Sequence, residues 1–331
     1  MSLNQRTAII VLNWNAAQDT VSCLESLLPV IENHRATIIV CDNHSNDDSV
    51  KRIKRWATPK FPISAAPNNA QFVLLQIKFN SGYASGNNVG IQYAIDHDFS
   101  HVWILNNDTV VTENALTALL RCSAQHPEIA CYGSTLVDYS ETRKVQCAAG
   151  CRYQPLTTVR TELYHGRDID WVRQQENNLA LDYVCGAAMF VNVEALRKTG
   201  LLNQQFFLYC EELDLAQRLR KAGFQLGWCK NSVVRHRTPS SREIGLQHQQ
   251  RLHYHENLST LIYTWSHHRP LFAFAAGFRF IAKLVVLPLS NRIQLVPSLF
   301  KAYFDFFTFR WQLDLFHQQP PNVGESLFLK K

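Results

Sequence analysis

The chain has 331 residues, of which 46 % are hydrophobic and 18 % charged, a balance typical of a globular protein with a sizeable core. Its length exceeds that of the usual single domain, so we expect one large domain with an appendage, or two domains. The nine cysteines are scattered and odd in number, which fits neither a secreted disulfide framework nor a paired-cysteine zinc site. No basic segment followed by an apolar run opens the chain, so we expect a reducing, cytoplasmic location.

The net charge of +6 belongs to the C-terminal part of the chain. Residues 1–230 carry 21 basic and 22 acidic side chains, whereas residues 231–331 carry 12 and 5. Such an excess favours an anionic partner, either nucleic acid or a membrane surface. Because this part is rich in aromatic and aliphatic residues, we expect a membrane surface and no nucleic acid.

The first elements alternate between buried strands and amphipathic helices. Continuous apolar runs predict strands buried on both faces at residues 8–12, 37–41, 73–77 and 102–105. Apolar residues at helical spacing predict helices over residues 19–31, after residues 45–48, and around residues 91–95. Four such alternations in 110 residues predict an α/β fold with a mostly parallel central sheet flanked by helices.

Each predicted strand ends in polar residues. They are Asn13 and Asn15, Asp42 and Asn43, Asn80 and Ser81, and finally Asn106, Asn107 and Asp108. Ligands bind at the carboxyl ends of the strands in sheets of this kind. The convergence of four polar ends therefore predicts a pocket at one edge of the sheet.

The polar end at Asn106-Asn107-Asp108 allows two interpretations. Oxygen-bearing side chains at the end of a rigid strand suit a hard cation or a sugar. The alternative is a polar turn that caps a helix starting near Thr112.

The positions of the glycines indicate which classes of nucleotide-binding site the sequence could form. Neither a GxGxxG motif nor a Walker A loop is present, which disfavours dinucleotide and P-loop sites. Gly82, Gly86 and Gly90 instead predict a flexible polar loop ahead of a helix, suited to a diphosphate or to close backbone approach. A simple turn at Gly86 is the alternative.

A second acidic cluster lies at Glu211, Glu212 and Asp214, where a helix begins after the aromatic run at residues 206–209. Acidic residues in a first helical turn often only complement the helix dipole. Three carboxylates within four residues also repel one another, and the helix dipole offsets this repulsion only in part.

Seven motifs in register resemble family 2 glycosyltransferases of the GT-A fold, most of all the bacterial rhamnosyltransferase-like subgroup of surface-polysaccharide biosynthesis. They are LNWN, VCDNHSND, FNSGYASGNNVG, LNNDTVV, CGAAMF, FFLYCEELDLAQRLRKAGF and VVRHRTPSS, within residues 7–260. The resemblance implies an inverting enzyme that uses a dTDP- or UDP-sugar, with rhamnose a candidate. The acceptor would be a hydroxyl of a saccharide or a polyprenyl-linked oligosaccharide.

The resemblance also implies roles for individual residues. The nucleotide sugar would be bound by Asn13, Asn15, Asp42, Asn80, Gly82, Asn88 and Asn107. A divalent metal, Mg²⁺ or Mn²⁺, would be coordinated by Asp108 and His236. Glu212 would be the catalytic base, with Glu211 as runner-up and Asp214 serving structure or acceptor orientation. A serine of the following loop, Ser240 or Ser241, would contribute as well.

The sequence departs from the family pattern at three places. The first acid of the metal motif is the amide Asn106, so metal binding has only one carboxylate. Glu212 stands where aspartate is more usual, and Glu256 replaces the arginine of an Arg-Asn pair, which leaves Asn257 alone.

We divide the chain into a catalytic domain at residues 1–265 and a basic, aromatic-rich helical extension at residues 266–331. Its apolar runs contain Arg279 and Lys283, which predict helices lying on a membrane surface, at the inner face of the plasma membrane, rather than crossing it. The alternative is packing on the catalytic domain or on a second subunit in a homodimer.

Two other functions compete with sugar transfer. A non-catalytic nucleotide-sugar-binding or scaffold protein could keep the pocket without the chemistry. A sugar-nucleotide pyrophosphorylase would need a glycine-rich basic loop after the first strand, and residues 13–16 contain no glycine.

Overall fold

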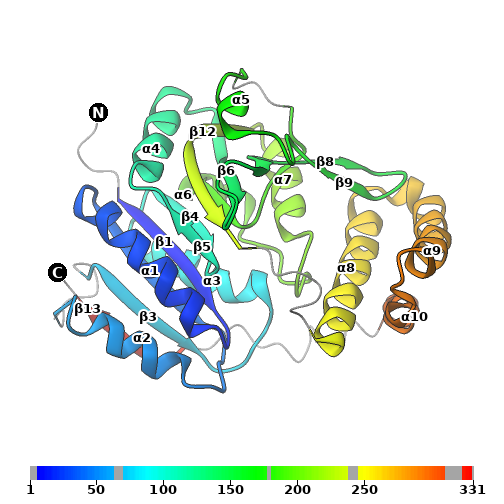
Figure 1. Cartoon of the computed structure of the whole chain (residues 1–331), viewed down its shortest axis with the longest axis horizontal. Coiled ribbons are helices and arrows are strands. Elements are labelled where there is room, and N and C mark those ends of the chain that lie inside the picture. The colour runs from blue at the N-terminus through cyan, green and yellow to red at the C-terminus, as the bar shows by residue number, and fades with distance from the viewer. Residues whose placement is uncertain (1–5, 63–69, 177–179, 238–244, 310–322, 330–331) are drawn as a thin grey trace.

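A computed structural model describes residues 6–62, 70–176, 180–237, 245–309 and 323–329. Its first half contains the predicted alternation of strands and helices (Figure 1). The elements are β1 (Thr7–Asn13), α1 (Ala17–Glu32), β2 (Ala36–Asp42), α2 (Ser49–Ala57), β3 (Phe72–Ile77), α3 (Tyr83–Asp96) and β4 (His101–Asn106). The four strands predicted from apolar runs are thus confirmed.

The second half adds further strands to the same sheet and forms a small second sheet. The main-sheet strands are β5 (Thr109–Val111), β6 (Ile129–Asp138), β7 (Val145–Ala148), β11 (Ala188–Asn192) and β12 (Gln225–His236). The small sheet has β8 (Gly150–Gln154), β9 (Val159–Glu162) and β10 (Tyr183–Val184). The helices are α4 (Ala115–Gln125), α5 (Ile169–Arg173), α6 (Val193–Thr199) and α7 (Glu211–Lys221).

The main sheet begins with a C-terminal strand, β13 (Val323–Leu329). Its order is β13-β3-β2-β1-β4-β11-β6-β12-β5, with β7 beside β6. The neighbours β3, β2, β1 and β4 are all parallel, whereas β11 is antiparallel to both β4 and β6. In this register Asn13 lies opposite Asp42, and Leu12 lies opposite Asn106. The polar strand ends therefore meet at one edge, as predicted.

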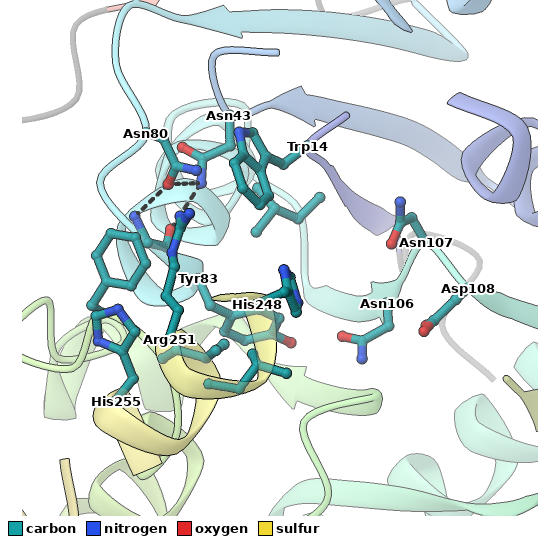
Figure 2. A pocket seen from close by; sticks show the side chains of 15 residues that line it. Trp14, Asn43, Asn80, Tyr83, Asn106, Asn107, Asp108, His248, Arg251 and His255 are labelled. Carbon is teal, nitrogen blue, oxygen red and sulfur yellow. Dashed lines mark hydrogen bonds between the residues drawn. The ribbon is translucent and has the colours of Figure 1, made fainter. Parts of the chain in front are cut away.

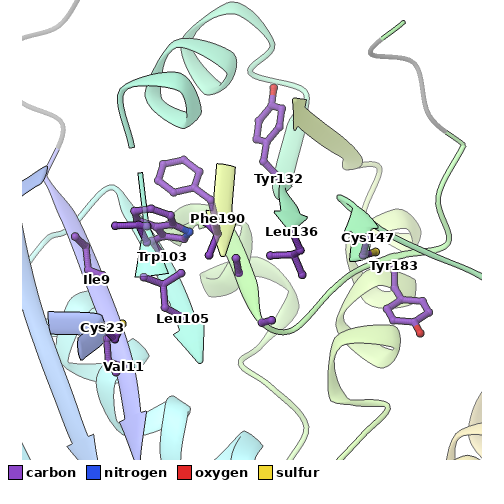
Figure 3. Packing of buried hydrophobic residues seen from close by; sticks show 14 of the residues in the cluster. Ile9, Val11, Cys23, Trp103, Leu105, Tyr132, Leu136, Cys147, Tyr183 and Phe190 are labelled. Atoms are coloured by element: carbon purple, nitrogen blue, oxygen red, sulfur yellow. The ribbon is translucent and has the colours of Figure 1, made fainter. Parts of the chain in front are cut away.

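The strands of the sheet centre are buried on both faces. Ile9 and Val11 of β1 pack in one apolar cluster with residues of α1 and α4, while Ile10 packs in the other with residues of α3. Figure 3 shows the first cluster, in which Trp103 and Phe190 lie between neighbouring strands. This two-sided burial makes the strand ends a rigid platform.

Two of the three glycines predicted to lie in a polar loop ahead of a helix are found elsewhere. Gly86 and Gly90 are inside α3 and not in a loop ahead of it. A Cβ at Gly90 would lie 2.8 Å from Ile10 Cγ2, and one at Gly86 would lie 2.5 Å from Leu12 Cδ1. The two glycines therefore let α3 pack closely on β1, and only Gly82 is left to shape the loop.

The C-terminal part forms three helices and a final strand: α8 (Leu246–His267), α9 (Phe272–Leu289), α10 (Val296–Phe307) and β13 (Val323–Leu329). Helices α8, α9 and α10 stand side by side at one end of the molecule (Figure 1), and the Tyr303 hydroxyl donates to Ala276 O across α9 and α10. Strand β13 returns to the main sheet and pairs antiparallel with β3. This part is therefore helical over residues 246–307, and its last described strand joins the main sheet.

The two cations of α9 face inward, not toward a membrane. Arg279 is buried and donates to Glu256 Oε1 at 2.8 Å, to Asn257 Oδ1 at 2.9 Å and to Thr158 Oγ1 at 3.0 Å. Lys283 also donates to Glu256 Oε1, at 3.2 Å. Because Thr158 lies in the turn between β8 and β9, one guanidinium joins α8, α9 and this hairpin. The expected polar face of an interfacial helix is therefore a packing surface.

Replacing Glu256 by glutamine should lower the melting temperature at pH 7. Burial raises the pKa of this carboxyl, but the charges of Arg279 and Lys283 outweigh that effect and lower the pKa to about 2. A carboxyl whose pKa is depressed on folding adds stability above its ordinary pKa of 4.5, which is lost as the pH falls toward 2. The difference in melting temperature between wild type and Glu256→Gln should therefore narrow as the pH falls from 4.5 toward 2.

The matched control is Glu194→Gln, because Glu194 forms an exposed ion pair with Lys198 at 3.9 Å. Its melting temperature should stay close to that of wild type, since exposed pairs contribute little. If Glu256→Gln were as stable as this control at pH 7, the ion pairs of Glu256 with Arg279 and Lys283 would not stabilise the fold.

Candidate active site

A pocket lies at the carboxyl edge of the sheet, between the strand ends and the start of α8 (Figure 2). Its floor comes from the residues that follow β1, β2, β3 and β4, and its opposite wall comes from α8 and the segment before α7. The lining residues are Leu12, Trp14, Asn43, Asn80, Gly82, Tyr83, Asn106, Asn107, Asp108, Phe207, Leu208, His248, Arg251, Leu252 and His255. Four of the predicted donor and metal residues line it: Asn80, Gly82, Asn107 and Asp108.

The residues predicted at the first two strand ends form an internal network instead. The buried Asn13 amide donates to Asp42 Oδ1 at 2.7 Å and accepts from the Thr20 hydroxyl at 2.6 Å. Asp42 is 2 % exposed and also accepts from the Ser45 hydroxyl and backbone N–H. Asn15 Oδ1 accepts from Asn46 N at 2.9 Å. These bonds fix the loops beneath the pocket.

The loop after β3 is held against the segment before α7. Asn80 Oδ1 accepts from Gly82 N and from Asn43 Nδ2, both at 3.0 Å. Gly82 has φ +93°, and a Cβ there would lie 2.3 Å from Phe207 O. Tyr83 N donates to that same carbonyl at 2.7 Å. Glycine is therefore required at position 82 by both conformation and space.

Asn88 lies outside the pocket. Its amide donates to Leu202 O at 2.8 Å and its carbonyl accepts from Leu202 N at 3.0 Å, so both ends of the side chain are occupied. The residue joins α3 to the segment that leads into α7.

Asp108 and His236 lie together at the other end of the pocket. Asp108 Oδ1 is 3.4 Å from His236 Nε2, yet this buried oxygen accepts no hydrogen bond. His236 Nδ1 is 3.0 Å from Gln146 Oε1, an acceptor, so Nδ1 donates its hydrogen there and Nε2 is the ring nitrogen that faces Asp108. Among the described residues no three His, Cys, Asp or Glu side chains gather to hold a metal. The protein thus offers two ligands here, and the rest would come from a ligand or water.

The turn into α7 is strained and firmly held. Tyr209 and Cys210 both adopt left-handed backbone conformations, with φ of 71° and 70°, at a cost of about 1–3 kcal/mol each. The Ser259 hydroxyl of α8 donates to Leu208 O at 2.8 Å, and Arg160 of β9 donates to Cys210 Sγ at 2.9 Å. These contacts fix the direction in which α7 begins.

Glu211 and Glu212 begin α7 as an interacting pair. Burial, followed by the charge of Glu212, raises the pKa of Glu211 well above its usual value. The raised pKa favours the neutral form of Glu211 beside its neighbour. Oε2 of each residue is buried without a hydrogen-bond partner.

Tyr83 links the carboxyl pair to the pocket. Its hydroxyl donates to Gly186 O at 2.8 Å, and a Cβ at Gly186 would lie 4.0 Å from Glu212 Cδ. Burial raises the pKa of Tyr83, as do the nearby charges of Glu211, Glu212 and Asp108. The charges at positions 108 and 212 thus both act on one pocket residue, although Glu212 does not line the pocket.

Asp214 has a structural environment. It is 3 % exposed and pairs with Arg218 Nε at 2.7 Å and with His267 Nε2 at 2.8 Å, so it ties α7 to the end of α8. Its partners lower its pKa against the effect of burial.

Eleven of the fifteen lining residues were not predicted as site residues, among them Trp14, Asn43, Tyr83, His248, Arg251 and His255. The first three lie within the quoted motifs, where their neighbours were chosen instead. His248, Arg251 and His255 are on α8, and nothing in the local sequence separates them from an ordinary polar helix face. Ser240 and Ser241 lie outside the described residues.

Replacing Glu211 by glutamine should stabilise the protein at alkaline pH. Because the folded-state pKa of Glu211 is raised, the folded protein holds a proton that the unfolded chain releases near pH 4.5, so wild type loses stability as the pH rises above that value. Glutamine keeps the neutral form at every pH. The variant should melt about 2–4 °C above wild type at pH 8, with no difference at pH 4. A variant that is less stable at pH 8 would show that Glu211 is ionised.

Comparisons with known proteins place this geometry in context. The chain is 22 % identical over 240 residues to the low-salt glycan biosynthesis hexosyltransferase Agl10 of Haloferax volcanii, an alignment that covers 70 % of this chain and 67 % of that protein. In structure it resembles the mannosyltransferase PcManGT from Pyrobaculum calidifontis, solved with GDP-Man and Mn²⁺, with a TM-score of 0.56 at 12 % identity, covering 91 % of this chain and 87 % of that one.

A second solved structure, S. aureus TarS 1–349, gives a TM-score of 0.54 at 12 % identity, over 91 % of this chain and 80 % of that one. These likenesses confirm the predicted GT-A fold. The family model described as "Glycosyltransferase like family 2" matches residues 5–254, which is most of the chain. The chain therefore belongs to the family 2-like glycosyltransferases.

Proposed function

We propose that this glycosyltransferase moves a hexose-type sugar from a nucleoside-diphosphate sugar to a hydroxyl group, with inversion at the anomeric carbon. The observation that carries the proposal is the pocket at the strand ends, lined by Asp108 with its unpaired oxygen and by Tyr83, on which the charges of Glu211 and Glu212 also act. The related hexosyltransferase from Haloferax volcanii supports the reaction class. Two similar structures contain GDP-Man or UDP-GlcNAc, which supports the class of donor.

In the proposed mechanism Glu212 is the general base. An acceptor hydroxyl oxygen attacks the anomeric carbon while the bond from that carbon to the diphosphate oxygen breaks. The nucleoside diphosphate leaves with the bonding electrons, and the hydroxyl proton passes to Glu212. Glu211, whose pKa is raised, stays neutral beside the base and does not compete for the acceptor proton.

Asp108 and His236 suit a divalent cation shared with the donor diphosphate. The unpaired Asp108 Oδ1 lies 3.4 Å from His236 Nε2, and a neutral imidazole would offer its lone pair at that nitrogen. Gln146 orients the imidazole from the other side, the usual arrangement behind a metal-binding histidine. A bound Mg²⁺ or Mn²⁺ would neutralise charge on the leaving diphosphate. Since Asn106 replaces the first acid, the donor itself would complete the coordination.

The outer faces of α9 and α10 fit a membrane surface. Large apolar side chains are exposed on both helices and on the turn between them: Phe274, Phe278, Ile281, Val285, Val286, Leu289, Ile293, Phe300, Phe304 and Phe307. Arg269–Leu289 is long and apolar enough to cross a membrane, with 28 % of its most apolar window buried. Crossing would break the bonds of Arg279 and Lys283 to Glu256, so we favour a helix that lies on the inner face of the plasma membrane.

This position would suit transfer to a saccharide on a polyprenyl-linked acceptor in surface-polysaccharide synthesis. Rhamnose and a dTDP- or UDP-linked donor remain part of the proposal on the resemblance alone. A non-catalytic binding protein would share the pocket but would have no use for a buried carboxyl pair beside it.

Replacing Glu212 by glutamine should lower turnover about 10²–10⁴-fold, because glutamine cannot accept the proton. Donor affinity should stay within about twofold, since Glu212 does not line the pocket. The matched variant Glu211→Gln preserves a neutral side chain and should keep turnover within about tenfold. Single-turnover transfer and calorimetric titration of the nucleoside diphosphate would measure the two effects.

A larger loss in Glu211→Gln than in Glu212→Gln would assign the base to Glu211. Donor binding without transfer or donor hydrolysis in wild type, across a panel of sugars and acceptors, would favour the binding protein.

Introducing a charge into the outer face of α9 by Ile281→Glu should reduce flotation with anionic phospholipid vesicles at least severalfold. The side chain is 65 % exposed, so the fold should tolerate the change. Trp171→Glu, in an exposed position of α5 at another end of the molecule, is the control (Figure 1). Unchanged flotation together with loss of a dimer in sedimentation would assign this face to a second copy of the chain.

A further inference from the structure

One end of the pocket lies away from Asp108 and is lined by aromatic, amide and guanidinium groups. Figure 2 shows Trp14, Asn43 and Asn80 together at this end, with Arg251 extending from α8 toward them, while Asp108 lies at the opposite end. Under the proposed function the diphosphate lies near Asp108, so the far end would receive the nucleobase. The following inference rests on that function.

Asp42 is poorly placed to hydrogen-bond a nucleobase. The carboxylate is 2 % exposed, and both of its oxygens already accept hydrogen bonds from Asn13 or Ser45. It does not line the pocket. Base recognition must therefore come from other side chains.

Asn43 presents a buried acceptor. The residue is 3 % exposed and lines the pocket, and its Nδ2 donates to Asn80 Oδ1 at 3.0 Å and to Gly82 O at 3.1 Å. These two bonds fix the amide orientation, so the other atom is the carbonyl oxygen. That Oδ1 is buried without any hydrogen-bond partner. A buried acceptor left unpaired is costly, so a ligand at this end gains by supplying an N–H or O–H donor.

Arg251 presents donors at the same end. Its guanidinium lies 4.9 Å from the centre of the Trp14 ring, which positions it by a cation–π contact. Within the described part of the chain it pairs with no carboxylate, and Asp108 is the one acidic residue that lines the pocket. Its N–H groups therefore suit carbonyl oxygens of a ligand.

We propose that Asn43 and Arg251 select a base with a ring N–H beside a carbonyl, namely uracil, thymine or guanine. Asn43 Oδ1 accepts the ring N–H, Arg251 donates to the adjacent carbonyl oxygen, and Trp14 holds the guanidinium in place. Adenine and cytosine present the reverse pattern, a ring acceptor beside an amino group, and would leave both protein groups unpaired. The enzyme is thereby restricted to UDP-, dTDP- or GDP-linked donors.

Calorimetric titration of UDP, dTDP, GDP, ADP and CDP into the full chain, with Mn²⁺ present, tests this selection. At least one of the first three should bind about tenfold or more tightly than ADP and CDP, since sites that pair a ligand's polar groups discriminate strongly. Arg251→Gln should remove most of this advantage while changing ADP affinity little. The matched control Arg269→Gln should keep the advantage, because Arg269 stacks on Trp265 at 4.1 Å outside the pocket.

Methylation of the base tests the role of Asn43 without changing the protein. N3-methyl-UDP, or N1-methyl-GDP if guanine is preferred, lacks the ring N–H and should bind wild type about tenfold more weakly than its parent. Equal affinity for the methylated base would overturn the role of Asn43.

The remaining outcomes separate this inference from the proposed function. If Arg251→Gln lost affinity equally for all five nucleotides, Arg251 would be a phosphate contact, and its role in base selection would be overturned. Equal binding of all five by wild type would overturn the inference alone. Binding of none would overturn both the inference and the proposed donor.

Discussion

The backbone contact between the loop after β3 and the turn before α7 determines the geometry of the whole site. Tyr83 N donates to Phe207 O, and Gly82 lets the two backbones approach because a Cβ would lie 2.3 Å from that oxygen. On one side of this contact the chain lines the pocket. On the other side it passes through the left-handed Tyr209 and Cys210 into the carboxyl pair of α7. The position of the proposed base relative to the donor is thus set by main-chain atoms, which hold a geometry better than long side chains do.

The sequence predicts the sheet and its polar edge because these depend on local patterns. Continuous apolar runs followed by Asn and Asp indicate strands buried on both faces that end together, and the parallel register of β1 with β2 and β4 confirms this. Motif residues were harder to assign, since the same Asn or Asp can bind a ligand or fix a loop. Asn13 and Asp42 hydrogen-bond each other beneath the pocket, whereas their neighbours Trp14 and Asn43 line it.

Contributions from distant segments could not be predicted in this way. The wall formed by α8 depends on how that helix packs, and its amphipathic pattern gives no preference to Arg251. The inward direction of Arg279 depends on Glu256, which stands where the family often has arginine. The same holds for β13, whose partner β3 lies about 250 residues earlier in the chain. Tertiary contacts, not local propensity, decide such features.

Glu211 and Glu256 show how neighbouring charges give two glutamates opposite properties. Burial raises the pKa of both, but Glu256 faces Arg279 and Lys283, while the largest charge effect on Glu211 comes from Glu212. The first arrangement lowers the pKa and joins α8 to α9. The second raises the pKa and leaves the fold less stable at neutral pH than a neutral side chain would. A protein retains such an unfavourable pair where it serves chemistry, so the contrast itself separates the structural glutamate from the proposed catalytic pair.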